Sequence, residues 1–177
     1  MWVAVVGPSG AGKDTLLSRV RVDLVDDPRF HFARRAITRA ADAGGEDHEA
    51  LDQAAFERRD FVLRWQAHGL LYGIPREEAP RGKVTVMNLS RGVLAEAASL
   101  APLLVAEVTA PPALLAARLA LRGRESAADI AARLTRDAPL PPGLAVRQVI
   151  NDGPVNLGVA RLRAVLEEAC EQAGIRP

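Results

Sequence analysis

Cysteine and lysine are scarce in this chain of 177 residues. The one cysteine, Cys170, excludes an internal disulfide and fits a reducing compartment. Only two lysines occur, Lys13 and Lys83, so nearly all of the 23 basic residues are arginines. Arginine presents a planar fork of N–H donors, and this composition therefore favours contacts with phosphate or carboxylate groups.

Long apolar runs and a strong net charge are also missing. No apolar stretch reaches the length of a membrane span, and the first expected strand begins at Trp2, which leaves no room for a signal peptide. The formal net charge is +1, so no global field attracts nucleic acid or a membrane. We expect a cytoplasmic protein with small-molecule partners, and neither nucleic acid nor a membrane among them.

Strand and helix patterns alternate along most of the chain. Short apolar segments predict strands at 2–6, 30–37, 61–67, 83–88, 102–109 and 145–150. Helices are expected after Gly12, over 51–60, after 83–88, from Pro111, over 125–137 and at the C-terminus. The alternation predicts one α/β domain with a central parallel sheet. Its core would comprise 1–37 and 76–177, and an insertion at 38–75 would contain a loop over 38–50 and a glycine turn over 68–75.

The segment GPSGAGKD at 7–14 has the spacing of a phosphate-binding loop. Its glycines allow backbone N–H groups to surround a phosphate, the next helix adds its positive N-terminus, and Lys13 adds a full charge. This pattern predicts a phosphate-binding site with Lys13 as a catalytic residue. The predicted nucleotide-binding residues are Gly7, Pro8, Ser9, Gly10, Ala11, Gly12, Lys13, Asp14 and Thr15.

Asp14 stands where a hydroxyl residue that holds Mg²⁺ is usual. A carboxylate is a good Mg²⁺ ligand, directly or through water, whereas without metal it would repel phosphate. We therefore interpret Asp14 as a metal-binding residue and expect nucleotide binding to depend strongly on Mg²⁺. The alternative is a solvated aspartate in the first helical turn, stabilised by the helix dipole.

Arginines are concentrated between 118 and 133, where a helix, a turn and a second helix are expected. Arginines that close over a transferring phosphoryl group stabilise its spreading charge. Together with a phosphate loop, this pattern predicts a lid over about 122–137, with Arg122 and Arg133 as catalytic residues.

At this point the chain resembles the guanylate-kinase-like branch of P-loop kinases over nearly its whole length. The matching segments are 7–14, Thr38-Arg39 with Gly45-Glu46, Tyr72-Gly73-x-Pro75, Arg122-Gly123 through Arg133-Leu134, and Val149-Ile150-Asn151-Asp152. The resemblance implies a three-layer fold with an acceptor-binding insertion and an arginine-rich lid. It also implies Mg²⁺–ATP as donor and Asn151 near the adenine.

Several positions depart from the guanylate-kinase pattern. Asp42 lies in the region of an expected second arginine, and Asn88 lies where an acidic residue is expected. Arg64, before Trp65, matches the place of the glutamate that binds guanine, and an arginine cannot accept the N–H groups of that base. We predict that Arg64 binds an acceptor phosphate instead. The simpler alternative is that Arg64 lies on the solvent face of an alternating strand and pairs with a nearby carboxylate.

A closer resemblance links GPSGAGKDT, ITRAADAGGEDHEAL, W-x-AHGLLYGIP and the Ser90-Arg91 turn to ribose 1,5-bisphosphate phosphokinases, a family associated with phosphonate degradation. It implies transfer of the γ-phosphoryl group of ATP to the 1-phosphate of ribose 1,5-bisphosphate, which gives 5-phosphoribosyl diphosphate. An acceptor with two phosphates and no base agrees with an arginine at the base-binding position. The residues alone indicate only a phosphoryl transferase whose acceptor is not guanylate.

The candidate acceptor-binding residues are Arg39, Glu46, Asp47, His48, Arg64, His68, Tyr72, Ser90 and Arg91. Arg39 and Tyr72 are the first candidates for phosphate, and Glu46 and Asp47 for ribose hydroxyls. Exposed polar loops and structural histidines are the corresponding alternatives. A nucleoside-monophosphate kinase and a non-catalytic interaction module remain open as functions, although the intact phosphate loop and lid argue against the module.

Overall fold

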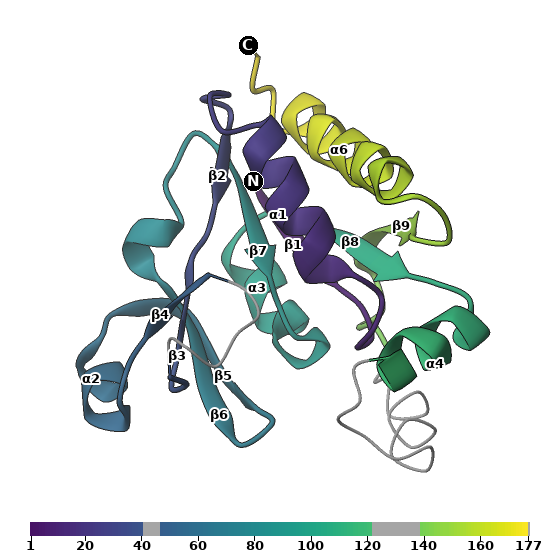
Figure 1. Cartoon of the computed structure of the whole chain (residues 1–177). Coiled ribbons are helices and arrows are strands. Elements are labelled where there is room, and N and C mark those ends of the chain that lie inside the picture. The colour runs from purple at the N-terminus through teal and green to yellow at the C-terminus, as the bar shows by residue number, and fades with distance from the viewer. Residues whose placement is uncertain (41–46, 122–138, 177) are drawn as a thin grey trace.

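The computed structural model describes residues 1–40, 47–121 and 139–176 (Figure 1). Within this part of the chain a five-stranded sheet has the order β2-β7-β1-β8-β9, with every neighbouring pair parallel. Its strands are β1 (Trp2–Val6), β2 (Phe30–Phe32), β7 (Val84–Asn88), β8 (Leu103–Thr109) and β9 (Ala145–Ile150). The predicted parallel α/β sheet is confirmed.

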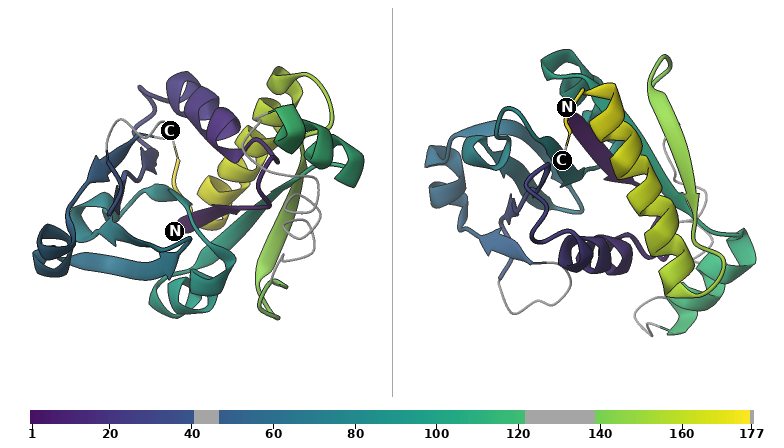
Figure 2. Two further views of the ribbon diagram at one scale, coloured as in Figure 1. Left: turned by 60° about the horizontal axis from the view of Figure 1, so that its bottom comes forward. Right: turned by 90° about the horizontal axis from the view of Figure 1, so that it is seen from above.

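Helices cover both faces of this sheet and make it the middle of three layers (Figures 1 and 2). Alternate residues of the fully buried β1 divide between two cores. Val3 and Val5 face α1 (Lys13–Asp23) and α6 (Val155–Gln172), whereas Trp2 and Ala4 face α3 (Leu94–Leu100). The helix α4 (Pro112–Leu121) lies beyond the carboxyl end of β8. In the described ranges no helix is long and apolar enough to cross a membrane.

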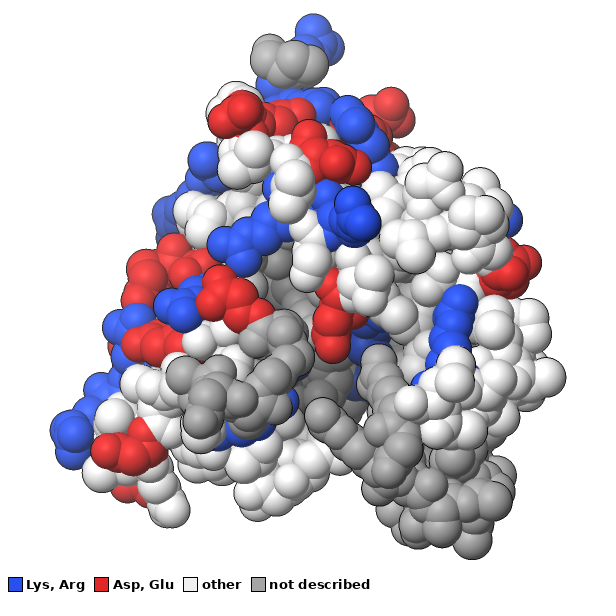
Figure 3. Space-filling model, viewed as in Figure 1, with Lys and Arg blue, Asp and Glu red and all other residues white. Residues whose placement is uncertain are grey.

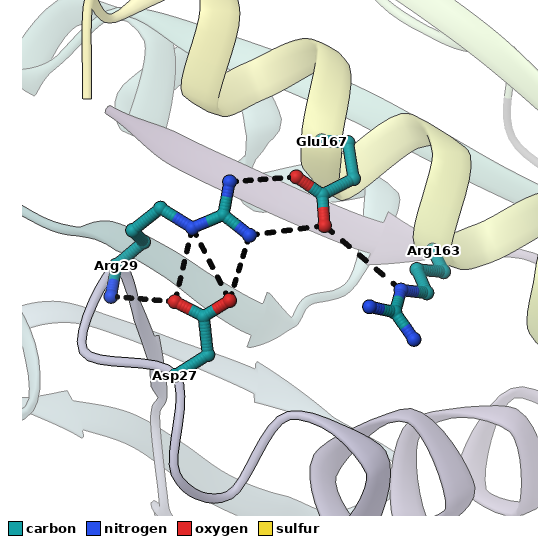
Figure 4. A network of polar contacts seen from close by, with 4 residues as sticks. All are labelled: Asp27, Arg29, Arg163 and Glu167. Carbon is teal, nitrogen blue, oxygen red and sulfur yellow. Dashed lines mark hydrogen bonds and ion pairs between the residues drawn. The ribbon is translucent and has the colours of Figure 1, made fainter. Parts of the chain in front are cut away.

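An ion-pair network ties the turn before β2 to α6 (Figure 4). The guanidinium of Arg29 donates to both carboxylate oxygens of Asp27 and to both oxygens of Glu167 on α6. These contacts hold the pKa of the Asp27 carboxyl below its ordinary value, chiefly through the hydrogen bond from Arg29. The network fixes the segment between α1 and β2 against the C-terminal helix.

A second sheet of the described residues has the order β4-β3-β6-β5 and builds the insertion. Its strands are β3 (Arg35–Ile37), β4 (His48–Ala50), β5 (Phe61–Ala67) and β6 (Leu70–Pro75), with α2 (Gln53–Arg58) between β4 and β5. Short 3-10 turns at Arg76–Glu78 and Arg91–Val93 complete the assigned elements. Pairing is antiparallel except between β3 and β4.

Three sequence expectations about the insertion are wrong. Residues 30–37 are not one strand, because the chain leaves the central sheet after Phe32 and joins the second sheet at Arg35, ahead of the expected boundary at 38. The expected loop over 38–50 contains β4, and the expected turn over 68–75 contains β6. Gly73 lies inside β6, where the Phe61 ring packs on it: a Cβ at Gly73 would lie 2.4 Å from that ring.

Candidate functional site

The phosphate loop joins β1 to α1 and lines a pocket with Ser9, Gly10, Gly12, Lys13, Asp14 and Thr15. Its curvature depends on glycines with positive φ angles, 145° at Gly7 and 88° at Gly12. A Cβ at Gly7 would lie 2.0 Å from the Val108 carbonyl oxygen, so the loop also passes too close to β8 for a side chain. The predicted residues 7–15 therefore form one continuous concave backbone at the N-terminus of a helix, the arrangement that binds anions.

Two side chains from outside the loop hold it in place. The amide Nδ2 of Asn151 donates to the Ala11 carbonyl oxygen at 2.8 Å, and a Cβ at Gly12 would lie 2.4 Å from the same nitrogen. Arg118 on α4 donates to the Gly10 carbonyl at 3.4 Å and to the Asn151 carbonyl at 3.0 Å. Asn151 is buried and packs under the phosphate loop. The bracing by Arg118 was not expected, since its spacing with neighbouring arginines indicated only a lid.

Lys13 and Asp14 have defined positions at the mouth of this loop. The Nζ of Lys13 donates to the carbonyl oxygens of Gly7 at 2.6 Å and Pro8 at 3.1 Å. One carboxylate oxygen of Asp14 accepts a hydrogen bond of 3.1 Å from Nδ2 of Asn88, at the buried end of β7. The amide at position 88 thus orients the loop carboxylate by a charge-assisted hydrogen bond.

The donor set around Asp14 fits a magnesium ion that is bound together with a nucleotide. Asp14 is exposed and lines the pocket, and Thr15 adds a hydroxyl. In the described residues no three His, Cys, Asp or Glu side chains gather as a metal cluster. An ion here would take its remaining ligands from phosphate oxygens and water, which is how Mg²⁺ is usually bound.

The second sheet presents one of its faces toward the phosphate loop. Trp65 on β5 donates from its indole Nε1 to the Ser90 hydroxyl at 2.8 Å. Ser90 lies just after Asn88 in the chain, with only Leu89 between them, and Asn88 is the partner of Asp14. On the same face of the sheet Tyr72 lies opposite Trp65, and their rings stack with centroids 5.5 Å apart. The acceptor candidates Tyr72 and Ser90 are therefore brought together on this face.

Arg39 and His48 form a pair at the end of the same sheet. An Nη of Arg39 lies 3.5 Å from Nδ1 of His48, and Nε2 of His48 lies 3.4 Å from the Arg39 carbonyl oxygen. His48 is 5% exposed, and its contacts with Arg39 fix the position of that arginine. The Nε of Arg39 is buried with no hydrogen-bond partner in the described part of the chain. A buried donor of this kind is costly unless a ligand completes its hydrogen bonding.

Arg64 is not brought to this face. Side chains alternate along a strand, and Trp65 faces Ser90, so Arg64 projects from the opposite side of β5. Its cross-strand neighbour is Gly73, and its own side chain is exposed. This position matches the solvent-facing alternative. The residues of β5 that share the face of Tyr72 are Leu63, Trp65 and Ala67.

Two further candidates lie away from the acceptor face. Asp47 is exposed and pairs with Arg34 at 2.9 Å and with Arg21 on α1 at 3.5 Å. His68 is exposed in the β5–β6 turn, where it has a φ of 52° beside Gly69 with a φ of 75°. Consecutive positive φ angles are typical of a type I′ hairpin turn, so His68 has a structural explanation.

Arg91 lies near the site in an ion pair. Its Nη2 contacts a carboxylate oxygen of Glu107 on β8 at 3.0 Å, and both side chains are largely buried. Figure 3 shows both signs of charge interspersed over the second sheet and α1, with few charges over α4.

The remaining candidates Glu46, Arg122 and Arg133, together with Asp42 and the expected lid, lie outside the described residues.

Comparison with curated proteins identifies clear relatives. A ribose 1,5-bisphosphate phosphokinase PhnN from Acidiphilium cryptum is 52% identical over 139 residues, which cover 77% of this chain and 76% of the relative. One from Ruegeria sp. is 46% identical over 175 residues, covering 93% and 90%. A bifunctional ribose 1,5-bisphosphokinase-thymidine phosphorylase from Azorhizobium caulinodans is 46% identical over 92% of this chain, which spans only 25% of that relative. No family model matches the chain.

Solved structures share the fold at low sequence identity. A gluconokinase from Sinorhizobium meliloti superposes with a TM-score of 0.58 and 17% identity, covering 97% of this chain and 94% of that one. A guanylate kinase from Anaplasma phagocytophilum has a TM-score of 0.57 and 16% identity, covering 96% and 85%. These likenesses confirm a P-loop kinase fold.

Proposed function

Because the chain belongs to the ribose 1,5-bisphosphate phosphokinase family, we propose that it phosphorylates ribose 1,5-bisphosphate with ATP. An oxygen of the acceptor's 1-phosphate forms a bond to the γ-phosphorus of ATP. The bond from that phosphorus to the β–γ bridging oxygen breaks, and its electron pair leaves with ADP. The other product is 5-phosphoribosyl 1-diphosphate.

On the donor side, the phosphate loop holds the nucleotide phosphates through its N–H groups. Lys13 neutralises charge on the transferring group, and Asp14, oriented by Asn88, takes part in binding Mg²⁺. The ion supplies charge neutralisation when it is bound. Arg118 and Asn151 preserve the loop geometry that these contacts require.

On the acceptor side, Tyr72 donates a hydrogen bond to the phosphate that reacts, Arg39 binds an acceptor phosphate from its place beside His48, and Arg91, paired with Glu107, borders the site close to the phosphate loop. A phosphate oxygen is already anionic near neutral pH, so the reaction needs no strong general base. Positioning and charge neutralisation then supply the catalysis. Arg122 and Arg133 complete the proposed set as residues that close over the transferring group.

One observation supports an acceptor without a base more than any other. The face of β5 that points toward Ser90 carries Leu63 and Trp65, and Leu63 is 1% exposed. A guanine would need hydrogen-bond acceptors for its N–H groups, and neither side chain can accept such bonds. This part of the proposed acceptor site is therefore unsuited to guanylate.

An acceptor panel tests the proposal. Purified protein is incubated with Mg²⁺–ATP and either ribose 1,5-bisphosphate, GMP, AMP or no acceptor, and ADP release is measured in each case. We expect release above the background with ribose 1,5-bisphosphate alone. Turnover of GMP or AMP at a higher kcat/KM would reassign the protein as a nucleoside-monophosphate kinase, and no turnover with any acceptor would favour a non-catalytic module.

A further inference from the structure

Arg35, at the start of β3, is a further charged side chain on the acceptor face. Its guanidinium carbon lies 5.2 Å from the centre of the Tyr72 ring. The ring of Trp65 stacks on the same tyrosine from the neighbouring strand. Arg35, Tyr72 and Trp65 therefore form a row across three adjacent strands, β3, β6 and β5.

The row has a near end and a far end with respect to the phosphate loop. Trp65 donates to Ser90, and Ser90 follows Asn88, which holds Asp14 of the loop. Tyr72 comes next, and Arg35 lies beyond it. A phosphate that receives the γ-phosphoryl group must lie at the loop end of this row. A second anionic group on the same acceptor, separated from the first by a sugar, would extend toward the far end.

Arg35 has the chemistry for that second group. Its guanidinium presents a planar fork of N–H donors that matches a phosphate bidentately. The side chain is half-buried and lies against an aromatic ring, which restricts its position and reduces the entropy lost when it binds an anion. The contact with the Tyr72 ring holds the guanidinium in position, and a bound phosphate would add charge-assisted hydrogen bonds, which are stronger than neutral ones.

Building on the function proposed above, we propose that Arg35 binds the 5-phosphate of the acceptor and sets the preference for a sugar with two phosphates. This residue, and not Arg64, is the arginine that reads the acceptor's remote end. Arg64 projects from the opposite side of the same sheet, away from the row. The two arginines thus form a natural pair for a test, with the exposed Arg58 of α2 as a third, charge-matched position.

The experiment compares Arg35→Ala, Arg35→Lys, Arg64→Ala and Arg58→Ala with the parent. First, kcat/KM is measured with ribose 1,5-bisphosphate at saturating Mg²⁺–ATP. Second, ribose 5-phosphate and ribose 1-phosphate are tested as competitive inhibitors, because each retains only one of the two phosphates. Thermal unfolding of every variant checks that the fold is retained. If Arg35→Ala does not fold, Arg35→Lys, which keeps the charge but not the planar fork, serves as the test variant.

We expect Arg35→Ala to lower kcat/KM at least tenfold, which corresponds to about 1.4 kcal/mol. The inhibition constant of ribose 5-phosphate should rise by a similar factor, whereas that of ribose 1-phosphate should change by less than about twofold, on the order of 0.4 kcal/mol. Arg35→Lys should lie between the parent and the alanine variant. Arg64→Ala and Arg58→Ala should behave like the parent.

Failure of the inference and failure of the proposed function give different results. A parent that does not phosphorylate ribose 1,5-bisphosphate refutes the proposed function. A parent that does so while Arg35→Ala keeps its affinity for ribose 5-phosphate refutes the role of Arg35. Loss confined to Arg64→Ala, equal weakening of both monophosphates by Arg35→Ala, or a parent that ribose 5-phosphate does not inhibit would overturn it as well.

Discussion

Replacing Gly12 by alanine tests the geometry of the phosphate loop directly. The residue has a φ of 88°, and its Cβ would lie 2.4 Å from Nδ2 of Asn151, so the Asn151 amide must move. A left-handed conformation costs a non-glycine residue about 1–2 kcal/mol. Displacing Asn151 also breaks its hydrogen bond to Ala11, worth about 1 kcal/mol. Gly12→Ala should therefore destabilise the fold by about 2–3 kcal/mol in total.

Gly82 provides the matched control, because it has a φ of 78° and no atom lies within 4 Å of an added Cβ. Gly82→Ala should cost only the backbone term, about 1–2 kcal/mol. In thermal unfolding, each kcal/mol corresponds to a fall in Tm of about 2–4 °C for a chain of this size. Calorimetric titration with Mg²⁺–ADP should show at least a tenfold loss of affinity, about 1.4 kcal/mol, for Gly12→Ala and none for Gly82→Ala. Parent-like ADP binding by Gly12→Ala would show that nucleotide binding does not need this loop geometry.

Further variants address the charges. Lys13→Ala should abolish nearly all turnover while far-UV circular dichroism stays parent-like, and activity within a few-fold of the parent would exclude its catalytic role. Asp14→Ala should lose more rate at low than at high Mg²⁺, and a magnesium titration that overlays the parent's would show that the carboxylate does not serve the metal. Arg29→Ala should cost about 2 kcal/mol at pH 7, and the exposed Arg147→Ala should cost clearly less, both measured by urea unfolding. Arg29 lowers the pKa of Asp27 in the folded protein, so this contact adds to the free energy of unfolding above the unfolded pKa near 3.8. The added stability should fade as the pH falls below that value. A difference in unfolding free energy between the parent and Arg29→Ala that stays constant from pH 7 to pH 3 would contradict this.

The central sheet and the phosphate loop could be predicted because their sequence signals are local. A buried apolar strand, a glycine loop and a helix follow one another between Trp2 and Asp23, and each element has its own periodicity or required residue. The parallel order also follows from alternating strands and helices. These features depend little on which distant segments pack against them.

The insertion was predicted less well because its signals depend on tertiary contacts. Gly73 indicates a turn by its residue type, but it lies in a strand paired on both sides, where the absence of a side chain makes room for the Phe61 ring. The place of Arg64 before Trp65 indicates an acceptor-binding role. The direction of the Arg64 side chain, however, follows only from the contact of Trp65 with Ser90, which puts Arg64 on the opposite face of β5. Arg35 carries no local signal, since its position over Tyr72 arises from the pairing of β3 with β6.

Phosphorus NMR of the complete reaction shows whether the proposed phosphoryl transfer to the sugar 1-phosphate occurs. Protein, Mg²⁺–ATP and ribose 1,5-bisphosphate are mixed, and the spectrum is followed with time. We expect loss of the γ-phosphorus signal of ATP, growth of the ADP signals, replacement of the sugar 1-phosphate signal by a coupled diphosphate pair, and an unchanged 5-phosphate signal. ADP accompanied only by inorganic phosphate, or a sugar spectrum that does not change, would contradict it.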